Sequence, residues 1–224
     1  MRVHLQREIE NLKKMVLALS ARVEESVEQA ARSIALRDTD LAREVIEEDY
    51  EIDQREVEVE EECLKILALH QPVAIDLRYI IAILKINSDL ERIGDLATNV
   101  AQGCIYLDES GPADFPFDFP RMAQKAQDMV NDSLDALVNR DPELARDVCL
   151  ADDEVDEINR QMYGLVDKAM RENPEHSDGF LRLLTVSHHL ERIADHATNI
   201  AEDVIYMSEG DIVRHAVSDE DEVS

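Results

Sequence analysis

Apolar residues recur every three to four positions along six long segments of the chain, with polar residues between them. This spacing places the apolar side chains on one face of a helix. The pattern therefore predicts an all-α fold, with helices at 4–36, 40–70, 74–107, 120–139, 142–172 and 177–208. Helix-breaking residues lie between the segments, at Asp38–Asp40, His70–Pro72 and Asn173–Pro174.

The two halves of the chain repeat one another. Residues 90–101, Leu-Glu-Arg-Ile-Gly-Asp-Leu-Ala-Thr-Asn-Val-Ala, return as residues 190–201, Leu-Glu-Arg-Ile-Ala-Asp-His-Ala-Thr-Asn-Ile-Ala. A second block, 37–43, returns as 140–146. This internal duplication predicts two tandem antiparallel three-helix bundles. We expect them at 1–107 and 121–209, joined by a Gly- and Pro-rich linker at 108–120 and followed by an acidic C-terminal tail at 210–224.

The charge of the chain is strongly negative. It has 51 Asp and Glu against 23 Lys and Arg, a formal net charge of −28. Such a surface repels phosphate backbones, so we expect no nucleic acid as a partner. Self-repulsion of this size is tolerated best where counterions are plentiful, which favours a high-salt, halophile-like cytosol.

Cysteines and hydropathy bear on the compartment. Cys63, Cys104 and Cys149 form no C-x-x-C pair, as expected of core thiols in a reducing compartment. No apolar run approaches the roughly 18 residues that a membrane span needs, and no leader pattern opens the chain. We therefore expect a cytoplasmic protein without membrane insertion.

Carboxylate pairs recur at equivalent places in the two halves. Each pair has four-residue spacing, which puts both acids on one face of a helix. The pairs are Asp49 and Asp53, Glu91 and Asp95, Asp152 and Asp156, and Glu191 and Asp195. At about 100° per residue, the acids of the third helix of each half lie nearly opposite its apolar stripe. A solvated helix face would explain any single pair, but it requires polarity and not the identity seen between the halves.

Carboxylates in pairs are hard ligands suited to Mg, Mn, Ca or Fe, and a bound cation would remove the repulsion of about 0.2–0.5 kcal/mol per pair. Asn99 and Asn199 share the acid faces and are further candidate ligands. His188 lies on the face of Glu191 and Asp195, so a nitrogen ligand is available in the second half alone. The sequence thus predicts metal sites on both bundles.

At the repeated Leu-Glu-Arg-Ile-Gly-Asp and Leu-Glu-Arg-Ile-Ala-Asp-His blocks, the sequence resembles the PhoU family of phosphate-uptake regulators. The resemblance extends to the linker at 111–121 and to the ending at 209–215. It implies a two-bundle fold with carboxylate metal sites, multinuclear iron or zinc in some members, at the eight acids named above, with the two asparagines as second-rank ligands. Fe, Zn, Mn and Mg therefore remain candidates. Ala151-Asp152-Asp153 stands where the first half has Glu48-Asp49-Tyr50, so the number of metal ions does not carry over.

The resemblance also implies a partner and a role. Such proteins are negative regulators that restrain the Pst phosphate transporter, through its ATPase subunit PstB, and hold the PhoR sensor kinase of bacteria in its signalling-off state. It further implies a homodimer. On this basis we expect a regulator and not an enzyme.

Two other classes of protein remain open. A ferritin-like di-iron enzyme also carries acids along bundled helices, but its sites use Glu-x-x-His motifs that project inward, and no Glu-x-x-His occurs in this chain. A metal-free helical scaffold or co-chaperone is the third class, because three-helix bundles support such roles readily.

Overall fold

The computed structural model describes residues 2–109 and 119–210, and these form six α-helices and one short 3-10 helix. The helices are α1 (Arg2–Leu36), α2 (Thr39–His70), α3 (Ile75–Glu109), α4 (Phe119–Asn139), α5 (Pro142–Glu172) and α6 (Ser177–Glu209), with the 3-10 helix η1 (Pro174–His176) before α6. The prediction of an all-α fold is confirmed, and every predicted helix end lies within two residues of the observed one. None of these helices is long and apolar enough to cross a membrane.

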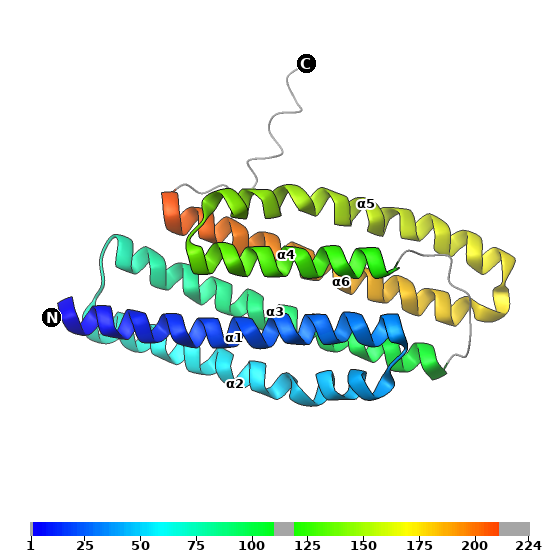
Figure 1. Ribbon diagram of the computed structural model, residues 1–224, viewed down its shortest axis with the longest axis horizontal. Helices are drawn as coiled ribbons and strands as arrows, with labels where there is room; N and C mark the ends of the chain where they lie inside the picture. Colours follow the sequence, from blue (N-terminus) through cyan, green and yellow to red (C-terminus); the bar gives the residue numbers. More distant parts are fainter. Residues whose placement is uncertain (1, 110–118, 211–224) are drawn as a thin grey trace, which may run out of the picture.

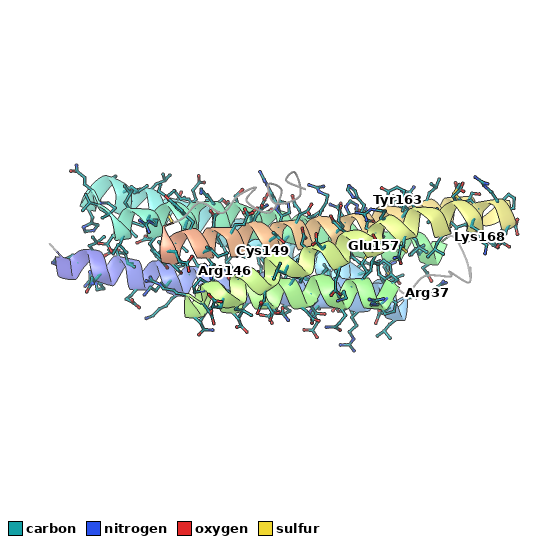
Figure 2. All side chains as sticks on the ribbon, turned by 90° about the horizontal axis from the view of Figure 1, so that it is seen from above. Arg37, Arg146, Cys149, Glu157, Tyr163 and Lys168 are labelled. Atoms are coloured by element: carbon teal, nitrogen blue, oxygen red, sulfur yellow. The ribbon has the colours of Figure 1, made fainter. Side chains whose placement is uncertain are left out.

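Aspartate caps begin the second helix of each half. Asp38 accepts hydrogen bonds from the backbone N–H groups of Asp40 and Leu41, and Asp141 does the same for Glu143 and Leu144. Such a cap satisfies N–H groups that have no partner within the helix. The residue before each cap, Arg37 or Arg140, has a positive φ of 53° or 52°, so the tight turn is repeated as well (Arg37 is labelled in Figure 2).

The two halves lie side by side and share a core. In Figure 1, α1–α3 form the lower part of the molecule and α4–α6 the upper part, with α3 and α6 packed against each other between them. Leu90, Ile93, Leu190 and Ile193 are at most 1% exposed and belong to one continuous apolar cluster. Burial of each such side chain contributes about 1.5–3 kcal/mol, so the contact between the halves is itself a source of stability.

The predicted linker and tail lie largely outside the described residues. Asp108 and Glu109 extend α3, and Phe119 and Pro120 begin α4, so helix reaches further into the predicted linker at 108–120 than the sequence indicated. Residues 110–118 and 211–224 are outside the described ranges. Cys63 and Cys104 are buried and Cys149 is half-buried, and all three are free thiols.

A small residue lets α2 and α3 approach closely in each half. A Cβ atom at Gly94 would lie 3.0 Å from Ile52 Cδ1 and 3.4 Å from Asp49 Oδ1. The second half has Ala194 at the matching position of α6 and the smaller Val155 at the matching position of α5. The methyl group gained on one helix is thus offset by the one lost on the other, which keeps the packed volume constant.

This exchange predicts strong coupling between positions 52 and 94. Gly94→Ala gains about 1 kcal/mol of helix propensity but crowds Ile52 at a cost of about 2 kcal/mol, so we expect a net loss of about 1 kcal/mol in the free energy of unfolding. Ile52→Val should recover that loss in the Gly94→Ala background while destabilising the native chain. Denaturant unfolding of the four proteins measures the coupling, and additive effects of the two substitutions would contradict the packing argument.

Candidate functional site

Carboxylates of α2 and α3 face one another in the first half. Burial raises the pKa of the Asp49 carboxyl, and the negative charges of Asp53 and Asp95 raise it further. Burial also raises the pKa of Glu91, with contributions from Asp95 and Asp53. The four acids are therefore close enough to affect one another, and we call the set the first acidic seam: Asp49, Asp53, Glu91 and Asp95.

The second half repeats the arrangement between α5 and α6. Burial, followed by the charges of Asp195 and Asp156, raises the pKa of Asp152 to about 6. The pKa of Asp195 is likewise raised by burial and by the charges of Glu191 and Asp156. The second acidic seam therefore consists of Asp152, Asp156, Glu191 and Asp195. Each seam combines two acid pairs from two different helices, which the sequence pattern identified only as separate pairs.

One acid in each seam has a buried oxygen without a partner. Asp49 Oδ1 and Asp152 Oδ1 are both buried and have no hydrogen-bond partner among the residues described. Thr98 and Thr198 lie beside these two carboxyls, and each opposes the rise in carboxyl pKa. An unpaired buried carboxylate oxygen costs free energy, so each seam has unused capacity to accept a donor or a cation.

The remaining predicted ligands are placed less uniformly. His188 Nδ1 lies 2.9 Å from Glu191 Oε2, so the imidazole does join the second seam. Asn199, by contrast, donates from Nδ2 to Asp89 Oδ1 of α3 at 3.4 Å, and its side chain is thus engaged with the other half. Asn99 is exposed on α3. The structure places four carboxylates in each seam and His188 in the second. It does not place Asn99 or Asn199 with them.

The donor chemistry suits a divalent cation, whereas the side-chain positions do not yet form a coordination shell. Carboxylate oxygens and one imidazole are acceptable ligands for Mg, Mn, Fe or Zn. Within residues 2–109 and 119–210, however, no group of three or more His, Cys, Asp and Glu side chains converges closely enough to hold a metal ion. The seams supply candidate ligands from two helices each, and ligation would require their side chains to converge further.

The raised pKa of Asp152 predicts a pH dependence of stability in the absence of metal. The native protein holds this proton up to about pH 6 and the unfolded chain only to about pH 4, so the free energy of unfolding should fall as the pH rises between those values. Asp152→Asn should flatten this decline and raise the free energy of unfolding at pH 7 by an amount on the order of 1 kcal/mol, after allowance for solvent screening.

Denaturant unfolding in chelator between pH 4 and 7 measures the effect. Asp147→Asn is the matched control, because this carboxylate is exposed on the same helix and is not among the charges that raise the pKa of Asp152. An unchanged pH profile in the Asp152→Asn protein would show that neither burial nor the neighbouring carboxylates raise the pKa of Asp152 in the folded protein.

A polar junction between the halves was not predicted from the sequence. Asp89 Oδ1 lies 2.8 Å from His196 Nδ1, and Lys85 Nζ lies 3.1 Å from Asp203 Oδ1. Asp89, His196 and Asp203 are each at most 8% exposed. Beside them is a polar cavity of about 500 Å³ whose lining includes Lys85, Asp89, Arg92 and Asp203.

The sequence feature that could have indicated this junction is a set of positions at which the two repeats differ. His196 and Asp203 stand where the first half has Leu96 and Gly103. A Cβ at Gly103 would collide with Val186 Cγ2 of α6, so the first-half copy must be small. His196 and Asp203, two positions that differ between the copies, therefore lie on the surface where the halves contact each other.

We expect a large loss of stability when His196 is replaced by leucine, the residue at the matching position 96 of the first half. His196→Leu leaves the Asp89 carboxylate buried without its imidazole partner and should lower the free energy of unfolding by about 3 kcal/mol. Adding Asp89→Leu removes the stranded charge and should recover most of the loss. Thermal unfolding of the single and double variants tests this, and equal instability of both would indicate that the pair contributes nothing specific.

Comparison with known families matches both halves of the chain. The model of the PhoU domain matches residues 16–103 and again residues 119–204. A phosphate-specific transport system accessory protein PhoU homolog of Aquifex aeolicus is 40% identical over 209 residues, which cover 93% of this chain and 95% of that protein. PhoU homolog 1 of Thermotoga maritima is 36% identical over 215 residues, covering 93% of this chain and 90% of that protein.

Solved structures agree with these matches. The crystal structure of PhoU from Pseudomonas aeruginosa has a TM-score of 0.88 at 39% identity and covers 92% of this chain and 99% of that one. The phosphate transport system regulatory protein PhoU from Streptococcus pneumoniae has a TM-score of 0.82 at 28% identity, covering 93% of this chain and 99% of that one. The similarity thus extends over the whole two-bundle arrangement.

Proposed function

The chain belongs to the PhoU family, and from this premise we propose that it is a negative regulator of phosphate uptake. The observation that carries the proposal is the match of both domain copies, over nearly the full length, to proteins named as accessory to the phosphate-specific transport system. On this proposal the protein acts on the cytoplasmic side of the membrane. It restrains the Pst transporter through the ATPase subunit PstB when phosphate is plentiful, and it holds a PhoR-type kinase in its signalling-off state where one exists.

We further propose that the two acidic seams are the metal-binding surfaces of this regulator. Asp49, Asp53, Glu91 and Asp95 would hold a cation in the first half, and Asp152, Asp156, Glu191 and Asp195 in the second, where His188 adds a nitrogen donor. A bound cation would supply positive charge that allows the carboxylates to remain ionised together. The raised pKa values of Asp49 and Asp152, and the buried oxygen without a hydrogen-bond partner on each of these residues, support the proposal.

The carboxylates of the seams would then control how a partner protein docks. With both carboxylate pairs ionised and drawn together, each seam presents a fixed, half-buried polar surface across two long helices. Without that neutralisation, repulsion between the helices favours protonation or outward rotation of the same side chains. The proposal therefore links the shape of the surface offered to a partner to the charge state of the seams, and we expect a homodimer to present these surfaces in duplicate.

Metal analysis of purified protein tests the seams directly. Protein prepared at high salt without chelator should contain stoichiometric Fe, Zn, Mn or Mg. The metal should be lost when four seam acids are replaced together, in the variant Glu91→Ala, Asp95→Ala, Glu191→Ala and Asp195→Ala. A matched variant replaces four exposed acids outside the seams, Glu24, Glu44, Glu47 and Asp147, and should retain the metal. Equal metal content in all three proteins would rule out the seams as its site.

The regulatory role is tested separately, by phosphate uptake in cells. Cells that carry the four-acid seam variant should take up phosphate at a high rate even when phosphate is plentiful, whereas the matched variant should restrain uptake normally. Circular dichroism should show that both variants remain helical. Normal restraint by the folded seam variant would favour a metal-free scaffold, and unchanged uptake on complete loss of the protein would overturn the regulatory proposal itself.

A ferritin-like di-iron enzyme is not supported by the arrangement of the acids. The carboxylates lie at the boundary of α2 with α3 and of α5 with α6, where Asp53 and Asp95 are exposed, and do not project into the apolar core of either bundle. Di-iron sites of that class are built in the bundle interior from Glu-x-x-His pairs, which this sequence does not contain.

A further inference from the structure

The polar cavity of about 500 Å³ lies where α3 of the first half packs against α6 of the second. We call it the junction cavity. Its lining residues come from these two helices alone, and all of them are polar or charged. Small-molecule sites in proteins have volumes of about 300–1,000 Å³, so the junction cavity is large enough for a molecule bigger than a single ion.

The charges of the junction cavity are found at one of two equivalent places on the α3–α6 contact. At the other place, 100 positions away in the sequence, Thr185, His189, Gln102 and Gly103 stand for Lys85, Asp89, Glu202 and Asp203. There Gly103 of α3 meets Val186 of α6, because a Cβ at Gly103 would lie 2.3 Å from Val186 Cγ2. The two helices therefore contact each other at the equivalent place without carboxylates or a lysine at these positions, so their contact does not by itself require the charges of the cavity.

Contacts within the protein hold three charged groups of the junction cavity in place. Lys85 Nζ lies 3.1 Å from Asp203 Oδ1 and 5.3 Å from the centre of the Tyr206 ring. Asp89 Oδ1 lies 2.8 Å from His196 Nδ1. Asp89 and Asp203 are 8% and 1% exposed, so the surrounding packing restricts their rotation as well. These side chains are oriented before a ligand arrives, which lowers the cost of ordering them on binding.

The two ends of the junction cavity differ in charge. Lys85 contacts Asp203, and Asp89 accepts a hydrogen bond from Asn199, so α3 and α6 run antiparallel past the cavity. Arg92 is seven residues beyond Lys85 on α3, about 10.5 Å along the helix, and therefore lies toward the end away from Asp203. One end thus contains a guanidinium, and the other contains the acids of α6.

The Arg92 end has the donors that an anionic group requires. Arg92 is exposed, and a guanidinium can bind a phosphate or carboxylate group through two parallel hydrogen bonds. Ser88 lines the cavity one helical turn before Arg92, on the same face of α3, and adds a hydroxyl group. The Asn199 amide that donates to Asp89 has a second N–H.

The acids at the other end restrict what else such a ligand can carry. Glu202 is half-buried and Asp203 is buried, and both line the cavity. Ionised carboxylates only accept hydrogen bonds, so they favour hydroxyl donors on a ligand and repel a second anionic group. A ligand that suits both ends therefore has one anionic group and, at some distance from it, hydroxyl groups.

We propose that the junction cavity binds a small hydroxylated anion, the class that includes sugar phosphates and sugar acids. Its anionic group lies against Arg92, and its hydroxyl groups lie toward Glu202. This inference goes beyond the proposed regulatory role, and it does not depend on metal in the acidic seams.

Titration calorimetry of the full chain tests the site, with ribose 5-phosphate and gluconate as probes. Each probe combines an anionic group with hydroxyl groups, and the pair distinguishes a phosphate ligand from a carboxylate ligand. Chelator in the buffer prevents a metal ion in the seams from binding the phosphate group. We expect one site per chain for at least one probe, and binding of ribose or of inorganic phosphate that is weaker by about tenfold or more, because each lacks one of the two kinds of group.

Arg92→Gln should weaken binding of the probe by about tenfold or more, because it removes charge-assisted hydrogen bonds to the anionic group. Arg192→Gln is the matched control and should leave binding unchanged. Arg192 occupies the equivalent position of α6, is also exposed and does not line the cavity. Circular dichroism should show that both variants remain as helical as the native chain.

Glu202→Ala tests the other end of the junction cavity. It should weaken binding of the probe while inorganic phosphate binds no more weakly than before. The absence of binding by both probes at millimolar concentration would overturn the proposal, as would an equal loss in the Arg92→Gln and Arg192→Gln proteins. Binding of inorganic phosphate as tight as that of ribose 5-phosphate would contradict the role assigned to the hydroxyl groups.

Discussion

Repulsion between carboxylates that the apolar core holds together is the constraint on which this structure depends. In each half, burial of one face of two long helices fixes their contact, and that contact places two acid pairs against each other. Burial raises the pKa values of Asp49, Glu91, Asp152 and Asp195, and the neighbouring carboxylates raise them further. Carboxyl pKa values raised at two equivalent places are typical of functional sites, and this agrees with the proposal that the seams bind metal.

Comparison of the two halves shows which residues are repeated and which differ. The outward residues of residues 90–101 and 190–201 are identical where they form the acidic seams, whereas His196 and Asp203 have diverged from Leu96 and Gly103 where α3 meets α6. Each half carries the same four-residue spacing of seam acids, whereas the polar junction between the halves is formed by residues that differ between the copies.

The sequence predicted the helices and the duplication well because both rest on periodicity and on local caps such as Asp38 and Asp141. It also predicted which acids pair within a helix. The contacts between helices could not be predicted from the sequence, because they depend on how the helices pack in three dimensions. Examples are the approach of Asp49 to Asp95, the pairing of Asp89 with His196 and the hydrogen bond from Asn199 to Asp89. The placement of Asn199 was inferred from its helical face alone, which cannot show that Asp89 of α3 lies within hydrogen-bond distance of its amide.

The free energy of unfolding as a function of divalent metal concentration, at constant ionic strength and pH 7, tests the central claim most directly. If the acidic seams bind a cation in the folded state, stability should increase with the logarithm of the concentration of Mn²⁺ or Zn²⁺, by about 1.4 kcal/mol per site for each tenfold increase above the dissociation constant. The increase should be absent when the seam acids are replaced. A native protein whose stability does not respond to any divalent ion would contradict the claim.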